Sequence, residues 1–526
     1  MKCLLAFLSI LFTGYALKAQ VNSARIDVID YEIEINLSDS TNRIKVVERI
    51  HCNVQERSGG LNFDLVAQDD TGRGMKVDYV LIGADTIPFK HINDQLQIDQ
   101  SFIPENGVVF MELRFSGIPV DGLIISQNKF GDRTFFGDNW PDRAHNWFAC
   151  VDHPSDKATV SFEVQAPKKY DVVAVGELLK VYEIGNDRMC FFKSNVPLPT
   201  KVMVVGIADF SFDNLFSGSG VPISNAIYSK ESPKVHEDMK VASDVLDFLE
   251  SFISRYEFHE LENVQSTTRY GGMENAGCIF YDENAFNGRS NGESLIAHEI
   301  SHQWFGNSAT ESDWQHIWLS EGFATYFANL YMRSKHGETA FDEQLAKDRR
   351  KVIQFSKNND HPIVDTNYSE LESLLNANSY EKGSWVLHML HNELGDSLFK
   401  YCMKEYYKRF RLSNASTVDL QNVIEQVTGR NLSVFFNQWL YSSGHPVLKI
   451  EPKMNREKTV LRIEQVQAQD HFVFPLKILL ELKNGELSEY VLNISERKEE
   501  FVLQTGSKVV GFKVDPETDL LFELVK

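Results

Sequence analysis

The chain has 526 residues, 43% of them hydrophobic and 12% aromatic, and its formal net charge is -21. This length exceeds that of one ordinary domain, and the apolar content excludes a largely disordered chain. The acidic balance argues against a nucleic-acid partner, because affinity for a phosphate backbone comes mainly from Lys and Arg. We therefore expect a folded protein of several domains that binds no nucleic acid.

The first nineteen residues have the pattern of a removable secretory signal. Lys2 precedes an apolar run from Cys3 to Phe12, and the small residue Ala19 precedes Gln20. A membrane anchor is the alternative, but the run is shorter than the roughly 20 residues that span a bilayer. We predict a signal peptide over residues 1–19 and export to the periplasm or the medium. No stable membrane span is expected after its removal.

The cysteines that follow the predicted signal are few and scattered. Their odd number and wide spacing indicate no compact disulfide framework, and no C-x-x-C pair of zinc ligands occurs. We expect buried free thiols at Cys52, Cys150, Cys190, Cys278 and Cys402.

Apolar residues tend to alternate with polar ones from Ile26 to about Phe212, which is the period of half-buried strands. One such run contains Tyr31, Ile33, Ile35 and Leu37. We predict a β-rich N-terminal domain over residues 20–218, which ends at the turn-like stretch FSGSG (216–220).

The period changes after this stretch. Met239, Ala242, Leu246, Leu249 and Ile253 recur at spacings of three or four residues, which indicates an amphipathic helix. Helical patterns then dominate, before the strand pattern returns in VLKIEP, TVLRIEQV and FPLKILLELK. We predict a catalytic domain over residues 219–443 and a small β-sandwich over 444–526.

The segment SLIAHEISHQWFGN contains H-E-x-x-H. Helical spacing of four residues places His298 and His302 on one face, where two imidazoles can share a metal ion. Glu299 is rotated by about 100° from His298 on an ideal helix, so it would reach a water at the metal rather than the metal itself. A helical histidine pair alone is more often packing than a metal site, so the pattern needs a third ligand.

Catalytic zinc commonly takes three protein ligands and keeps one position for water. Glu321 follows His302 after eighteen intervening residues, in the second helical stretch IWLSEGFATYFANLY. If the two helices pack together, this carboxylate reaches the same point as the histidines. The sequence thus predicts one zinc ion per chain, held by His298, His302 and Glu321, with Glu299 as the general base.

Taken together, the motifs resemble those of the gluzincin zinc aminopeptidases, the family of aminopeptidase N and leukotriene hydrolase. GGMENAG at Gly271 to Gly277 resembles the G-x-M-E-N exopeptidase motif, and YEKGSWVLHML at Tyr380 to Leu390 resembles the catalytic-tyrosine motif. The segments WFACVDHPSDKATVSF and TGRNLSVFFNQWLYSSGHP are also similar, so the resemblance extends over nearly the whole mature chain.

The resemblance implies a multidomain α+β fold. Its parts would be a β-rich N-terminal domain, a thermolysin-like α/β catalytic domain and a small C-terminal β-sandwich. The long α-helical C-terminal domain of many relatives would be absent.

The resemblance also implies roles for single residues. Glu274 would bind the free α-amino group of a peptide, and Tyr380 would donate a hydrogen bond to the oxyanion of the reaction. The residues that would align the substrate are Gly271, Gly272, Met273 and Asn275. The expected function is zinc-dependent removal of amino-terminal residues from peptides with a free amino terminus.

The sequence departs from the family pattern in two places. Where relatives carry a Gln or Glu that helps to hold the substrate amine, this chain reads FFGDNWPDRAHNWF, and the position falls near Trp140. Either a neighbouring residue replaces it, or Glu274 and Glu321 alone bind the amine. The neighbouring candidates are Asp138, Asn139 and Asp142. Ser320 stands where many relatives carry Asn.

Three other functions stay open on the same frame: a zinc endopeptidase, an epoxide hydrolase and a non-catalytic scaffold. The GGMEN motif favours the exopeptidase over the first two. A scaffold would be expected to lose ligands or the base, whereas His298, Glu299, His302, Glu321 and Tyr380 are all present. No motif indicates the preferred amino-terminal residue or the oligomeric state.

Overall fold

The computed structural model describes residues 26–56, 59–105, 107–289, 292–454 and 458–525, so the predicted signal at 1–19 lies outside the described part. The chain divides into two units. The first contains the residues up to 314 together with 369–372 and 407–415, and the second contains 315–368, 373–406 and 416–526. Among the described residues, no helix is long and apolar enough to cross a bilayer.

An eight-stranded sheet forms the N-terminal part of the first unit. The predicted alternation is confirmed in its first strand, where Tyr31, Ile33 and Ile35 are at most 1% exposed, because side chains on one face of a strand share one environment. This strand pairs antiparallel with the second strand and parallel with the strand at 157–167. In spatial order the strands are β13 (Glu177–Ile184), β14 (Asp187–Pro199), β11 (Lys157–Pro167), β1 (Ile26–Asn36), β2 (Ile44–Val54), β8 (Val108–Ile118), β4 (Gly74–Ile82) and β5 (Asp85–Thr86).

Two smaller sheets complete this β-rich region. One contains β12 (Asp171–Ala174), β15 (Val205–Ala208), β10 (Arg133–Gly137) and β9 (Leu123–Gln127). The other contains β3 (Leu61–Asp64), β7 (Gln95–Ile98) and β6 (Phe89–Ile92).

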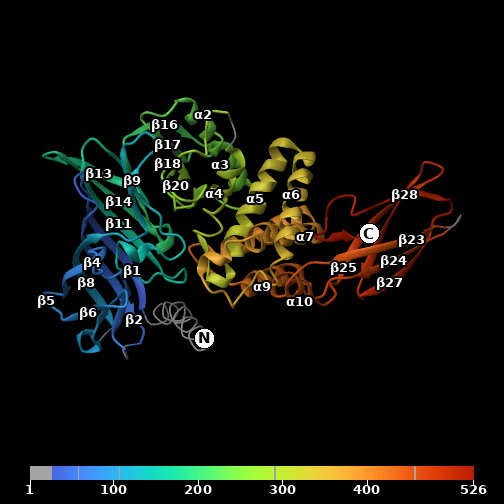
Figure 1. Cartoon of the computed structure of the whole chain (residues 1–526), viewed down its shortest axis with the longest axis horizontal. Helices are drawn as coiled ribbons and strands as arrows, with labels where there is room; N and C mark the ends of the chain where they lie inside the picture. Colours follow the sequence, from blue (N-terminus) through green and yellow to red (C-terminus); the bar gives the residue numbers. More distant parts are fainter. Residues whose placement is uncertain (1–25, 57–58, 106, 290–291, 455–457, 526) are drawn as a thin grey trace. The chain divides into compact units, whose positions relative to one another are not determined.

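A five-stranded mixed sheet with adjacent helices carries the motifs of the first unit (Figure 1). Its strands are β16 (Phe210–Phe216), β17 (Pro222–Tyr228), β18 (Leu261–Ser266), β20 (Cys278–Asp282) and β19 (Gly272–Met273). The helices are α2 (Lys234–Met239), α3 (Ala242–Phe252) and α4 (Glu293–Ser301). The predicted helix from Met239 to Ile253 is therefore two consecutive helices. A short parallel pair, β21 (Ala309–Glu311) and β22 (Ser413–Ala415), lies in the same unit.

The FSGSG stretch is the turn of the β16–β17 hairpin. Gly220 adopts a φ of 94° there, a backbone conformation that glycine accepts without steric cost. Strands on both sides of the predicted boundary between residues 218 and 219 thus belong to one sheet. The domain boundaries themselves stay a prediction.

Helices form the first part of the second unit. Their buried side includes Trp318, Phe323 and Tyr326, none of which is exposed. The main helices are α5 (Trp318–His336), α6 (Glu338–Ser356), α7 (Gly383–Leu394), α9 (Thr417–Thr428) and α10 (Ser433–Phe436), and α8 (Asp396–Phe410) crosses the division between the units. Two π-helical segments, η6 (Asn378–Lys382) and η7 (Asn437–Tyr441), precede α7 and follow α10.

Two sheets of mainly antiparallel strands end the second unit (Figure 1). Leu461, Leu476 and Ile478 in these sheets are fully buried. One contains β27 (Lys498–Gln504), β24 (Lys458–Gln465), β23 (Val447–Met454) and, in parallel, β29 (Glu523–Val525). The other contains β26 (Leu487–Ile494), β25 (Phe474–Leu482) and β28 (Val509–Val514). The α+β prediction, with a β-rich start, a helical middle and a C-terminal strand region, is confirmed.

Candidate active site

Helix α4 presents the first two residues of the H-E-x-x-H motif, and His302 follows directly after its last residue. The chain stays helical there, because the His302 amide donates to the carbonyl oxygen of His298 at 3.3 Å. The Nε2 atoms of the two histidines lie 3.0 Å apart, and their rings are inclined by 83°. The structure therefore brings both imidazoles to one point, as the four-residue spacing predicts.

The donor set at this point fits a zinc ion. Two ligand atoms at about 2.0–2.1 Å from a tetrahedral zinc lie about 3.3 Å apart, close to the separation of the two Nε2 atoms. On its other side, the His302 ring places Nδ1 3.3 Å from the carbonyl oxygen of Phe305. A backbone acceptor of this kind fixes the tautomer in which Nε2 keeps a lone pair for a metal.

The backbone of β19 passes directly over the carboxylate of the predicted base. A Cβ atom at Gly272 would overlap Oε1 of Glu299, so the carboxylate would have to move. At the neighbouring Gly271, an added Cβ would meet only Cδ1 of Leu295, at 3.9 Å. The second glycine of the motif therefore leaves room for the Glu299 carboxylate.

Glu274 lies beside the base and one of the histidines. Ligand atoms of Glu274, Glu299 and His302 lie within 4.8 Å of one another, and the three residues are 5%, 4% and 1% exposed. Within the described part of the chain, Oε1 of Glu274 is buried and has no hydrogen-bond partner. The first unit thus holds a buried carboxylate that is available to a ligand, next to the H-E-x-x-H motif.

Two amide side chains outside the predicted site bind the GGMENAG segment (271–277), which we call the motif loop. Gln303 accepts a hydrogen bond from the Gly277 amide at 2.8 Å and donates one to the Glu274 carbonyl oxygen at 2.9 Å. Nδ2 of Asn307 donates to the same carbonyl oxygen at 2.6 Å. The sequence gives no signal for their burial, because Asn and Gln are mostly exposed in folded proteins.

The other two residues of the predicted motif loop are buried. Met273 is 3% exposed on β19, and Asn275 is not exposed at all. Both side-chain polar atoms of Asn275 have no hydrogen-bond partner among the residues that the structure describes. The substrate-aligning roles of these residues and of Gly271 stay predictions.

Glu321 and Tyr380 both belong to the second unit. Glu321 lies in the first turn of α5 and is 3% exposed, and Tyr380 is half-buried in the π-helical segment η6. The two elements are in close contact, because a Cβ atom at Gly322 would lie 3.0 Å from the Gly383 backbone and 3.1 Å from the Ser379 carbonyl oxygen. π-helical turns occur frequently at functional sites.

Two of the acidic or amide side chains near Trp140, Asp138 and Asn139, form hydrogen bonds with other groups of the protein. Asp138 is fully buried and accepts a hydrogen bond from Nη2 of Arg143 at 2.6 Å, and Nε of Arg269 lies 3.7 Å away. Nδ2 of Asn139 donates to two backbone carbonyl oxygens, and its Oδ1 accepts from the indole of Trp147 at 2.7 Å. Both candidates for an amine-binding role therefore already have partners.

Asp142, the third candidate, is half-buried. Burial raises the pKa of its carboxyl to about 7, and the nearby His145 acts in the opposite direction. Its role as a replacement for the family Gln or Glu stays a prediction.

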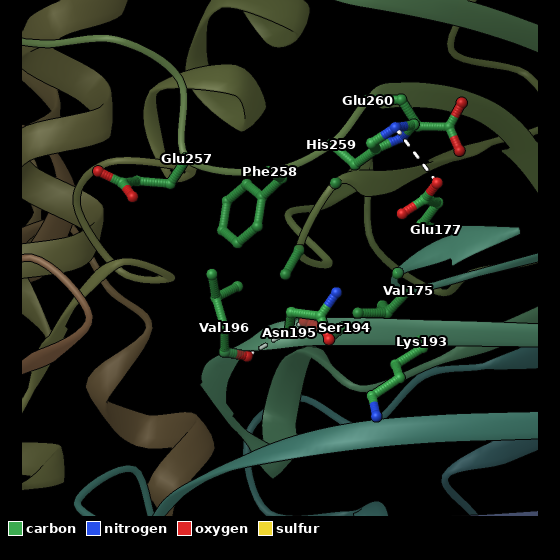
Figure 2. Close-up of a pocket in the computed structure, with 13 residues that line it drawn as sticks. Val175, Glu177, Lys193, Ser194, Asn195, Val196, Glu257, Phe258, His259 and Glu260 are labelled. Atoms are coloured by element: carbon green, nitrogen blue, oxygen red, sulfur yellow. Dashed lines mark hydrogen bonds and ion pairs between the residues drawn. The ribbon is translucent and has the colours of Figure 1, made fainter. Parts of the chain in front are cut away.

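A cavity of about 240 Å³ lies at the end of the motif loop, where Ala276 and Gly277 form part of its wall (Figure 2). Glu177, His259 and Glu260 lie together on one side, where Nε2 of His259 lies 3.6 Å from Oε1 of Glu177, and Glu257 lies on the opposite side. Burial raises the pKa of the adjacent Glu260. None of the predicted catalytic side chains lines this cavity, so it is separate from the H-E-x-x-H motif.

Comparisons with known proteins agree with this geometry. Residues 237–439 match the Peptidase family M1 domain. The glutamyl aminopeptidase of Sus scrofa is 26% identical over 380 residues, which are 69% of this chain and 40% of that protein. Probable aminopeptidase 1 of Sulfurisphaera tokodaii is 26% identical over 483 residues, which are 88% of this chain and 58% of that protein. The matches thus cover well under two thirds of the length of these relatives.

A solved structure has the same fold over most of the chain. It is the crystal structure of Legionella pneumophila aminopeptidase A in complex with aspartic acid, with a TM-score of 0.82 and 18% identity. The likeness covers 95% of this chain and 60% of that one. This likeness in fold includes the region that matches the Peptidase family M1 domain.

Proposed function

We propose that the protein is a zinc-dependent aminopeptidase that removes amino-terminal residues from peptides. The observation that carries this proposal is the position of Glu274 in the first unit. Its buried carboxylate lies within 4.8 Å of ligand atoms of Glu299 and His302, and Oε1 has no partner in the described part of the chain. A carboxylate so placed can bind an α-ammonium group through a charge-assisted hydrogen bond, which an internal peptide bond cannot offer.

The proposed metal ligands are His298, His302 and Glu321, with one zinc ion per chain. Two observations support this set: the convergence of the two Nε2 atoms at 3.0 Å and the match of residues 237–439 to the Peptidase family M1 domain. When bound, zinc would lower the pKa of a water molecule and polarise the substrate carbonyl.

The chain's own residues would do the remaining work. Glu299 would accept a proton from the attacking water and pass it to the leaving amine. Glu274 would bind the α-ammonium group, so that only the first peptide bond reaches Glu299. Tyr380 would donate a hydrogen bond to the developing oxyanion.

Hydrolysis of aminoacyl 4-nitroanilides tests this function. We expect release of nitroaniline from substrates with a free amino group, loss of activity with 1,10-phenanthroline, and recovery on addition of zinc. A panel of Glu, Asp, Leu, Ala and Arg substrates would define the preferred residue. Activity that a chelator does not affect would contradict the zinc assignment.

The role of Glu274 can be tested separately. Replacement by Gln keeps the size of the side chain and removes its charge, so the ammonium group loses a charge-assisted contact worth about 1.5–3 kcal/mol. We expect KM for free-amino substrates to rise about 10- to 100-fold. The control Glu177→Gln makes the same change at the separate cavity and should leave KM nearly unchanged. If the wild-type enzyme cleaves amino-acetylated substrates as readily as free ones, the protein is an endopeptidase instead.

We also propose export, on the basis of the signal pattern at residues 1–19. Expression of the full chain in a bacterial host with a secretion system, followed by mass analysis of the periplasmic and medium fractions, would test this. The expected mature chain begins at Gln20. Recovery of only uncleaved protein inside the cells would contradict the proposal.

A further inference from the structure

The loop that carries Glu274 is held through its backbone. The Glu274 carbonyl oxygen accepts hydrogen bonds from Gln303 and Asn307, at 2.9 and 2.6 Å. By contrast, Oε1 of the Glu274 side chain has no hydrogen-bond partner among the described residues. Because one carboxylate oxygen is not held by other side chains, the position of the carboxylate depends on where the backbone of residue 274 is fixed.

Both amides come from the segment that directly follows the H-E-x-x-H motif. Gln303 is the next residue after His302, and its Oε1 also accepts from the Gly277 amide at 2.8 Å, so one side chain binds both ends of the loop turn. Asn307 is tied to the same segment, because its own amide donates to the His302 carbonyl oxygen at 3.0 Å. The two side chains are 1% and 0% exposed.

A half-buried lysine, Lys157, binds the segment from the N-terminal β-region. Nζ of Lys157, at the start of β11, donates to the carbonyl oxygens of Asn307 and Ser308 at 3.1 and 2.7 Å. It also donates to Oγ1 of Thr310 at 3.0 Å. Residue 307 therefore has fixed contacts on two sides, with β11 and with the Glu274 loop.

We propose that Gln303 and Asn307 are positioning residues that fix Glu274 relative to Glu299 and His302. They act through the Glu274 carbonyl oxygen and set the distance between the group that binds the substrate amine and the group that handles the proton. This inference rests on the proposed aminopeptidase function. It adds that the segment which follows the H-E-x-x-H motif also positions Glu274, the residue proposed to bind the substrate's amino terminus.

The expected effect follows from the geometry of the reaction. A displacement of about 1 Å between a bound substrate and a catalytic group can reduce a rate about 100-fold. A shift of the Glu274 backbone moves the ammonium site while His298, Glu299 and His302 stay on their helical segment. The cost therefore falls on substrates with a free amino group, and amino-acetylated substrates serve as the internal reference.

Near-isosteric variants test the positioning role. Asn307→Asp and Gln303→Glu keep the volume and remove the donor to the Glu274 carbonyl oxygen. The matched control is Asn263→Asp, since Asn263 is also fully buried in the same unit. Its Nδ2 donates to Asn225 at 2.9 Å, and its Oδ1 accepts from the Tyr281 hydroxyl at 3.2 Å. KM and kcat are measured on free and acetylated anilides, together with zinc content and melting temperature.

We expect kcat/KM for free-amino substrates to fall about 10- to 100-fold in both test variants, mainly through KM, with zinc content unchanged. The preference for free over acetylated substrates should shrink in parallel. In a Glu274→Ala background, the same substitutions should change kcat/KM less than about threefold, because the group they position is gone. The control should lower the melting temperature and leave the preference unchanged.

Two outcomes would overturn the positioning role: a loss of stability with an unchanged substrate preference, or effects that add fully to those of Glu274→Ala. A wild-type enzyme without any preference for free amino groups would contradict the proposed function instead. In that case amide exchange over residues 271–282 still decides the inference. The Gly277 amide should exchange faster in Gln303→Met than in wild type. Equal rates would contradict the role of Gln303 in holding the loop through its hydrogen bond to this amide.

Discussion

Two acidic side chains of the first unit, Glu274 and Asp138, show how a similar residue can serve opposite purposes. Both are at least 95% buried. Asp138 is bound by Arg143 at 2.6 Å, with Arg269 at 3.7 Å, so its charge is already paired inside the protein. Oε1 of Glu274 has no hydrogen-bond partner in the described part of the chain. Both are buried acidic residues, so the residue type does not distinguish them. What distinguishes them is whether a side chain of the protein already pairs with the carboxylate.

The largest effect is expected at the base beside Glu274. Glu299→Gln removes the proton acceptor and keeps the side-chain shape, so kcat should fall roughly 10²- to 10⁴-fold. Zinc content should stay at one ion per chain, because Glu299 is not a proposed ligand. Rates and metal analysis of the same preparation check both points. A rate near that of wild type would show that another group is the base.

The structural role of Asp138 gives the next largest effect. Asp138→Asn leaves Arg143 buried beside a neutral amide, and loss of one partner of a buried pair costs about 3–5 kcal/mol of unfolding free energy. Urea denaturation measures this loss. The control Asp132→Asn breaks the exposed pair with Lys230 and should cost less than about 1 kcal/mol. If the Asp138→Asn protein is fully stable but has a changed substrate preference, Asp138 contributes to substrate binding and is not a structural residue.

A substitution in β19 tests how closely the loop approaches the base. Gly272→Ala places a methyl group 2.3 Å from the present position of Oε1 of Glu299, which must move. Because the carboxylate is the flexible end of its side chain, we expect a loss of about 100-fold in kcat with a nearly unchanged melting temperature. Gly271→Ala is the comparison variant, because its added methyl group has only Leu295 within 4 Å. Since Gly271 is a predicted substrate-aligning residue, its effect should fall on KM and leave kcat nearly unchanged. Equal losses in both variants would argue against a specific contact with Glu299.

The smallest effect is expected at a buried cation in the second unit. Lys382 is 1% exposed, its Nζ has no hydrogen-bond partner among the described residues, and burial lowers its pKa to about 7. The unfolded chain therefore binds a proton more readily than the folded one between about pH 7 and 10. It follows that this lysine favours unfolding as the pH falls from 10 to 7.

Lys382→Met should accordingly raise the melting temperature at pH 7, by roughly 1–2 °C, and the gain should shrink towards pH 10. Lys351→Met, at an exposed lysine paired with Glu381, is the control and should show no such gain. A gain of the same size at both pH values would mean that packing rather than proton binding causes it.

Much of the fold could be predicted because local patterns carry it. The alternation of Tyr31, Ile33 and Ile35 predicts a strand with one buried face, and the structure confirms it. The spacing of His298 and His302 likewise predicts the convergence of their Nε2 atoms, since it depends only on the geometry of one helical turn. The single predicted helix from 239 to 253 was wrong in detail, because α2 ends at Met239 and α3 begins at Ala242.

The partners of the site residues could not be predicted in the same way. Arg269 follows Asp138 by 131 residues, and only packing of the β-rich region against the motif loop brings the two together. Near Trp140 the sequence offered three candidates for an amine-binding residue. Two of them, Asp138 and Asn139, have partners inside the protein that include residues from distant parts of the chain, and these could not be read from the sequence. The ligand set, the tyrosine and the substrate-aligning residues stay predictions of the sequence.

The spacing within H-E-x-x-H and the order of the motifs could be read from the sequence alone, because they depend on residues close along the chain. The match of residues 237–439 to the Peptidase family M1 domain rests on the same residues. Only the tertiary structure decided which charges are open to a ligand. Helix and strand periods act over a few residues, whereas hydrogen-bond partners of buried groups are supplied by segments far apart in sequence. The hydrogen bonds from Gln303 and Asn307 to the Glu274 carbonyl oxygen are of this long-range kind.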